Sequence, residues 1–180
     1  MRAFIAIDIG EKEEIVELLK ELKKIKGRIK PVEPENIHLT LKFLGEIDEG
    51  MISKIKETIE RSVEGISPFK ANLSGLGVFP SINYMRVLWI GFKDEGQTKK
   101  IAAELEKELH KYGFKKEKGF TPHVTIARIK SKEVKEEIRK FIERYKEKSF
   151  GEVECNEIRL KKSILKPEGP IYKTIEEIKL

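Results

Sequence analysis

HLTL at residues 38–41 returns as HVTI at residues 123–126, so one pattern of histidine, apolar, threonine, apolar is written twice. The chain has only three histidines, and two of them begin this pattern. Side chains of a strand alternate between its faces, so each histidine shares a face with its threonine while the apolar residues point the other way. We therefore expect two half-buried strands, each presenting an imidazole beside a hydroxyl.

The two patterns lie inside a longer repeat of strand, helix, strand, helix and strand. The periodicity of apolar residues predicts strands at 2–9, 37–44 and 69–78 with helices at 11–26 and from 48, then strands at 86–92, 123–129 and from 150 with helices at 95–112 and 132–147. The segment 75–85 is expected to be an ordered loop between the halves, and 169–180 a last strand.

This order predicts an α+β fold with two pseudo-symmetric lobes, each a mixed, mainly antiparallel sheet with helices on its outer face. The lobes would form a single bilobal domain over 1–180, built from units at roughly 1–80 and 84–165 plus the C-terminal strand. If a pseudo-two-fold axis relates them, the two imidazole–hydroxyl pairs face each other across a central cleft.

Composition indicates which class of partner and which cellular compartment to expect. The net charge is +6, which favours polyanionic partners, although on charge alone lysine-rich solvated helix faces are the stronger explanation. Lys and Glu dominate the charged residues and Gln97 is the only glutamine, a bias typical of thermophile proteins. Cys155 is the only cysteine and no apolar run reaches the roughly 20 residues of a membrane span, so we expect a cytoplasmic protein with no membrane partner.

Two facing imidazoles suit acid–base chemistry better than metal binding, because zinc sites use three or four protein ligands and no cluster of Cys or carboxylates accompanies the motifs. With an unperturbed pKa near 6.5, one imidazole can accept a proton while the other donates one. The threonine hydroxyls suit the oxygens of a phosphodiester. A lone strand histidine is more often structural, and His110, expected in the last turn of its helix, fits that ordinary role.

The wider flanks HLTLKFLGEID, TPHVTIAR and GPIY resemble the two-histidine phosphoesterases, in particular their RNA 2′,3′-cyclic phosphodiesterase branch, historically called 2′-5′ RNA ligase. The resemblance implies a V-shaped cleft and hydrolysis of RNA 2′,3′-cyclic phosphates to 2′-phosphates without metal or cofactor. His38 would be the proton donor to the 3′-oxygen and His123 the proton acceptor that activates water. Thr40 and Thr125 would hold the phosphate.

The resemblance also implies partners. We expect RNA with 2′,3′-cyclic phosphate or 2′-phosphate ends, tRNA fragments among them, with room for a nucleotide in the cleft of a monomeric protein. Arg128 matches a basic residue that this branch carries five positions after the second motif histidine. In a regular strand Arg128 would point away from His123, so a site role requires the strand to end or bulge near Ala127.

Two further residues are weaker candidates for substrate binding. Lys42 shares the His38 face of its strand and could bind phosphate, although it is equally well explained as an ordinary exposed lysine of a strand. Tyr84, in the segment 75–85, could stack a base.

Two alternatives remain open from the sequence. The same site run in reverse would join RNA ends in a 2′-5′ linkage. A protein of another class, a non-catalytic RNA- or nucleotide-binding module with a basic cleft, would keep binding without either histidine. No P-loop pattern GxxxxGK[ST] is present to indicate nucleotide hydrolysis.

Overall fold

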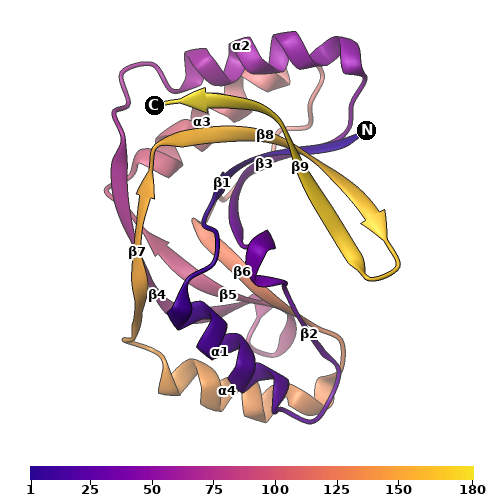
Figure 1. Cartoon of the computed structure of the whole chain (residues 1–180), viewed down its shortest axis with the longest axis vertical. Helices are drawn as coiled ribbons and strands as arrows, with labels where there is room; N and C mark the ends of the chain where they lie inside the picture. Colours follow the sequence, from indigo (N-terminus) through magenta and orange to yellow (C-terminus); the bar gives the residue numbers. More distant parts are fainter.

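The computed structural model describes every residue from Met1 to Leu180. The chain forms two sheets and four α-helices, which Figure 1 shows with their labels. The strands are β1 (Arg2–Asp8), β2 (Ile29–Pro31), β3 (His38–Glu46), β4 (Phe69–Ser81), β5 (Tyr84–Lys93), β6 (His123–Ile129), β7 (Ser149–Cys155), β8 (Glu157–Lys166) and β9 (Gly169–Lys179). The helices are α1 (Glu13–Lys23), α2 (Ile52–Ser62), α3 (Gln97–His110) and α4 (Lys135–Arg144), with short 3-10 turns η1 (Pro34–Asn36), η2 (Glu49–Met51) and η3 (Lys132–Val134).

The first sheet has the strand order β3-β1-β8-β9 and the second β2-β6-β5-β4-β7. Every pair of neighbouring strands is antiparallel. The predicted α+β class with mainly antiparallel sheets is thereby confirmed. The motif strands occupy equivalent places, because β3 pairs with β1 in one sheet as β6 pairs with β5 in the other.

Each sheet is covered by one helix from each half of the chain. Helices α2 and α3 pack on each other and on the first sheet, while α1 and α4 pack on the second. Figure 1 shows these two helix pairs at opposite ends of the molecule. The cause is amphipathicity, since α1 buries Ile15, Leu18, Leu19 and Leu22 on one stripe and leaves its Glu and Lys residues in solvent.

Three features differ from the sequence-based expectation. The segment 75–85 is no loop between halves, because β4 and β5 run through it and turn at residues 82–83. Strands β2 and β8 were not predicted; β2 has only three residues, and β8 is rich in charged and polar side chains that obscure its alternation. The two sequence halves also exchange strands, because β8 and β9 complete the sheet begun by β1 and β3.

None of the helices is long and apolar enough to cross a membrane.

Candidate active site

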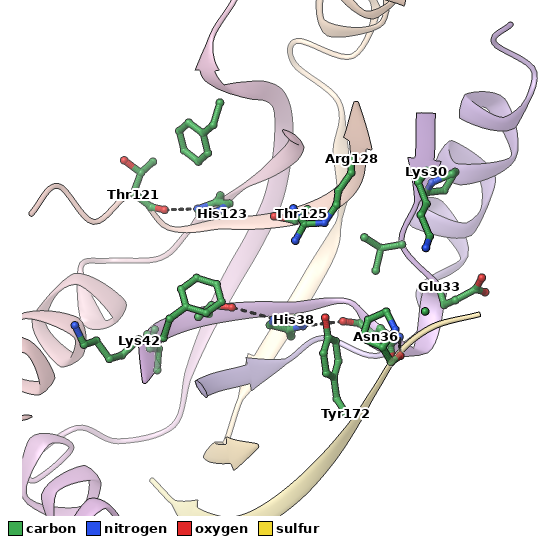
Figure 2. Close-up of a pocket in the computed structure, with 18 of the residues that line it drawn as sticks. Lys30, Glu33, Asn36, His38, Lys42, Thr121, His123, Thr125, Arg128 and Tyr172 are labelled. Carbon is green, nitrogen blue, oxygen red and sulfur yellow. Dashed lines mark hydrogen bonds between the residues drawn. The ribbon is translucent and has the colours of Figure 1, made fainter. Parts of the chain in front are cut away.

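A cavity of about 1000 Å³ lies between the sheets, and both motif strands line it. His38 and Thr40 of β3 lie on one wall, and His123, Thr125 and Arg128 of β6 on the other. Figure 2 shows the two histidines in the middle of this space, one on each wall. The structure therefore brings the predicted pairs together across one cleft.

The backbone fixes the orientation of the His38 ring. Its Nδ1 donates to the Asn36 carbonyl at 2.7 Å, and because a carbonyl only accepts, Nδ1 must carry a hydrogen. The opposite nitrogen, Nε2, lies 2.9 Å from Thr40 Oγ1 and faces the cleft. Thus the ring offers Nε2 for proton transfer.

Burial lowers the pKa of His38 below its ordinary value, because the protonated form loses water there. The hydrogen bond to Asn36 opposes this shift, the nearby Lys161 ammonium adds to it, Asp8 opposes it, and His123 adds to it. The charges come from the neighbouring strands: Asp8 pairs with His38 across β1 and β3, and Lys161 Nζ bonds both Asp8 carboxylate oxygens at 2.7 and 2.9 Å.

His123 is held in the same way. Its Nδ1 donates to the Thr121 carbonyl at 2.6 Å, which again leaves Nε2 toward the cleft. Phe79 packs edge-on against the ring with centroids 4.9 Å apart, and Trp89 lies at 5.9 Å. In both histidines Nδ1 therefore bonds the backbone carbonyl two residues earlier, and Nε2 is the nitrogen left for chemistry.

A β-bulge resolves the orientation of Arg128. Across β5 and β6, Leu88 pairs with Ala127 and Trp89 with Thr125, so Ile126 is an extra residue in the ladder. Ile126 and Ala127 are both buried, and Arg128 is exposed and lines the cleft. Strand β3 bulges at the equivalent place, because Ile5 pairs with Lys42 and Ala6 with Thr40, so that Leu41 has no pairing residue on β1. In both strands the fifth residue after the histidine thus faces the cleft.

The first strand presents Phe43 at that fifth position. Its side chain is 64% exposed and lines the cavity. Sequence reasoning missed Phe43 because regular alternation from His38 places it on the core face. The duplication could have found it, since Phe43 and Arg128 occupy matching positions in HLTLKF and HVTIAR.

The same bulge changes the setting of Lys42. Its side chain borders the cavity but is 3% exposed, and its ammonium pairs with Glu106 at 2.8 Å and donates to the Lys115 carbonyl at 2.7 Å. Figure 2 shows Lys42 directed away from His38. The ammonium is therefore already satisfied by protein groups.

Tyr84 is not brought to this site. It begins β5, half exposed, and does not line the cavity. Gly91 is the residue of β5 that pairs with His123, and Tyr84 lies seven positions away along the strand, about 23 Å. The assumption of a loop over 75–85 had placed Tyr84 too near the cleft.

Two other residues support His38 and were not anticipated. Asn36 supplies the carbonyl for Nδ1, and its amide donates to the Pro170 carbonyl at 3.2 Å, which ties η1 to the β8–β9 hairpin. Tyr172, of the GPIY stretch, packs edge-on against His38 with ring centroids 5.3 Å apart. Burial raises the pKa of Tyr172, and the charge of Arg128 opposes that shift across the cleft.

No group of three or more His, Cys, Asp or Glu side chains is arranged to hold a metal ion.

Comparison with known proteins places this site in a family. The family model described as AKAP7 2′5′ RNA ligase-like domain matches residues 4–180. A curated protein of Methanocaldococcus jannaschii named RNA 2′,3′-cyclic phosphodiesterase is 46% identical over 98% of this chain and 99% of its own length. One of Archaeoglobus fulgidus with the same name is 41% identical over 97% and 98%.

Among solved structures, TT0787 of Thermus thermophilus superposes with a TM-score of 0.81 at 30% identity, covering 100% of this chain and 98% of that one. The match runs through both motif strands and both sheets, because it spans the whole chain. The chain therefore belongs to the family of AKAP7 2′5′ RNA ligase-like domains.

Proposed function

We propose that the protein hydrolyses RNA 2′,3′-cyclic phosphate ends to 2′-phosphates, with the two imidazoles as acid and base. One observation carries the proposal: His38 and His123 lie on opposite walls of one cleft, each with Nδ1 bonded to a backbone carbonyl, which leaves Nε2 as the nitrogen available for proton transfer. The activity is that named for the relatives of Methanocaldococcus jannaschii and Archaeoglobus fulgidus.

In the proposed reaction a water molecule attacks phosphorus on the side opposite the 3′-oxygen. His123 Nε2 accepts the proton of that water as the new P–O bond forms. The bond from phosphorus to the 3′-oxygen breaks, and His38 Nε2 donates its proton to that oxygen. The products are a 3′-hydroxyl and a 2′-phosphate, and each proton transfer contributes about 10²–10⁴ in rate.

The phosphate would rest between the two threonines and the arginine. Thr40 already lies within hydrogen-bonding distance of His38 Nε2, and Thr125 occupies the matching place on β6. Arg128 has no carboxylate within 4.0 Å, so its guanidinium is free to bind non-bridging oxygens with two donors. The anionic phosphate also favours the protonated form of His38, which offsets the effect of burial on its pKa.

The same path run backwards would join a cyclic phosphate end to a 5′-hydroxyl in a 2′-5′ linkage. Hydrolysis is favoured in dilute solution because water is in large excess over RNA ends. We further propose that the chain works in a reducing cytoplasm, since its only thiol is buried and unpaired. We also propose that it works as a monomer.

The test uses an oligoribonucleotide that ends in a 2′,3′-cyclic phosphate, incubated with the protein and EDTA. We expect conversion to a 2′-phosphate end. His38→Ala and His123→Ala should each lose at least about 10²-fold in rate. His110→Ala is the matched control, because His110 ends α3 and bonds only the Phe114 carbonyl.

Three results would contradict the proposal. Equal turnover by the wild type and both motif variants would remove the histidines from the chemistry. Loss of activity in EDTA, restored by a divalent cation, would show that the imidazoles do not suffice. Tight RNA binding without turnover would favour the non-catalytic binding module.

A further inference from the structure

The cleft extends past the histidines in two directions, and its two ends carry different side chains. Beyond His123 lie Phe43 and Phe120, and we call this end the aromatic arm. Beyond His38 lie Arg128 and three lysines, and we call this end the basic arm; the lysines are Lys30, Lys130 and Lys166. Figure 2 shows Lys42 and Thr121 toward one end and Lys30 toward the other, with the histidines between.

The three lysines come from three different segments. Lys30 lies on β2, where it pairs with Arg128 across the ladder. Lys130 follows β6 directly, and Lys166 ends β8. The two walls approach each other here, because a Cβ added to Gly169 at the start of β9 would lie 4.0 Å from Lys30 Nζ. An anion in this arm would thus meet cations from both sheets.

The lysines are not neutralised by the protein. Three carboxylates, those of Glu33, Glu35 and Glu168, border the same arm and are exposed. None of them lies within 4.0 Å of an ammonium of the arm, although the structure contains fifteen ion pairs between carboxylates and lysine, arginine or N-terminal cations elsewhere. Figure 2 shows the Glu33 carboxylate turned away from the histidines and the Lys30 ammonium turned inward.

The shape of the substrate requires two exits. In a ribose whose 2′- and 3′-oxygens are fixed between the histidines, the base leaves from C1′, beside C2′, and the 5′-chain leaves from C4′, beside C3′. Base and chain therefore diverge from the reacting edge. An aromatic side chain suits a base and lysines suit phosphates.

We propose that the basic arm binds the phosphate that links the terminal nucleotide to the one before it, so that the enzyme prefers RNA chains of two or more nucleotides over cyclic mononucleotides. This inference rests on the proposed function and adds the substrate class and the direction in which the chain leaves. Lys30, Lys130 and Lys166 contact the linking phosphate, whereas Arg128 contacts the reacting one.

The experiment compares uridine 2′,3′-cyclic phosphate with the dinucleotide UpU ending in the same cyclic phosphate. For the wild type, kcat/KM should be at least roughly tenfold higher on the dinucleotide, the value of one charge-assisted phosphate contact. The triple variant Lys30→Gln, Lys130→Gln, Lys166→Gln should lose most of this preference while its kcat/KM on the mononucleotide stays within about twofold. For this variant, the slope of log kcat/KM against log salt concentration should also become shallower with the dinucleotide, and it should stay unchanged with the mononucleotide.

The matched control is Lys99→Gln, Lys100→Gln, Lys107→Gln, which changes the net charge equally on exposed positions of α3 outside the cleft. It should keep the wild-type preference. A preference that survives in the arm variant, or an equal loss on both substrates, would overturn the proposal.

Equilibrium binding separates this inference from the proposed activity. Uridine 2′-phosphate and UpU 2′-phosphate are titrated against the wild type and the arm variant. Tighter binding of the dinucleotide, lost in the arm variant, supports the arm even if no substrate is turned over. Turnover of both substrates with equal efficiency would support the proposed activity and refute the proposed role of the basic arm.

Discussion

At the scale of single residues, the environment of His38 makes its protonation the sensitive step of the proposed reaction. Burial lowers its pKa, and Lys161 lowers it further while Asp8 opposes this. We expect Lys161→Met to raise the pKa of His38, because the variant removes one nearby cation and leaves the Asp8 carboxylate paired with Arg159 alone, at 3.0 Å. The measurement is an NMR titration of the His38 ring in the wild type and in the variant.

The direction of the pH effect on stability follows from the same shift. A lowered pKa means that the folded chain binds fewer protons at His38 than the unfolded chain, so this residue destabilises the fold as the pH drops below about 6.5. Addition of a 2′-phosphate ligand should raise the pKa of His38. A ring that titrates above its ordinary value in the free protein would refute the account of its burial.

Lys42 shows how a residue on the right strand can serve a different purpose. Its ammonium holds the Lys115 carbonyl, and its partner Glu106 accepts the Glu117 amide at 2.8 Å. The ion pair therefore anchors the segment between α3 and β6, which includes Thr121, the residue that orients His123.

We expect Lys42→Met to cost about 2–3 kcal/mol in the free energy of unfolding. This is less than the cost of leaving a fully buried charge without a partner, because the Glu106 carboxylate reaches solvent. The substitution should also lower kcat, because His123 loses its fixed carbonyl. Lys111→Met, which breaks the exposed pair with Glu108, is the control and should leave the free energy of unfolding nearly unchanged. Denaturant unfolding and initial rates measure both effects, and a Lys42→Met protein with wild-type values of each would exclude the anchor.

At the scale of elements, the bulges decide which side chains the motif strands bring to the cleft. The alternation in HLTL and HVTI was enough to place His38, Thr40, His123 and Thr125 on one face each. The alternation did not place the residues that follow each motif correctly. An extra residue at Leu41 or Ile126 moves every later side chain of the strand to the opposite face. Nothing in single-sequence periodicity marks a bulge, which is why Lys42 and Phe43 exchanged expected positions.

The paired bulges make Phe43 the aromatic counterpart of Arg128. We expect Phe43→Ala to weaken kcat/KM about 10- to 100-fold on RNA ends, mainly through KM, because base stacking on an aromatic ring contributes about 1–3 kcal/mol. Phe43→Trp should retain most of the activity, whereas Phe43→Leu should not. A Phe43→Ala protein that discriminates purine and pyrimidine ends as the wild type does would show that no base rests there.

At the scale of the whole molecule, the exchange of strands ties the two halves of the sequence into one folded unit. The repeat predicted two similar halves, but it carried no information about which sheet each strand joins. That choice depends on long-range pairing, in which β4 leaves the first half to pair with β5 and β7, while β8 returns to pair with β1. Neither half therefore contains a complete sheet with its covering helices.

Cys155 provides a probe of this unit, because it lies on β7 opposite Phe69 of β4 and is 1% exposed. Burial raises the pKa of its thiol to about 12, so at pH 8 the folded chain should react with a disulfide reagent only through unfolding. We expect fragments 1–82 and 83–180, cut in the β4–β5 turn, to be unfolded when separate, with Cys155 of the second fragment labelled at the rate of a free thiol. Mixing the fragments should restore protection of Cys155 together with cyclic phosphodiesterase activity, since the active cleft needs His38 from one fragment and His123 from the other. Slow labelling of the isolated second fragment would show that this half folds alone, and the strand exchange would then be a late docking step.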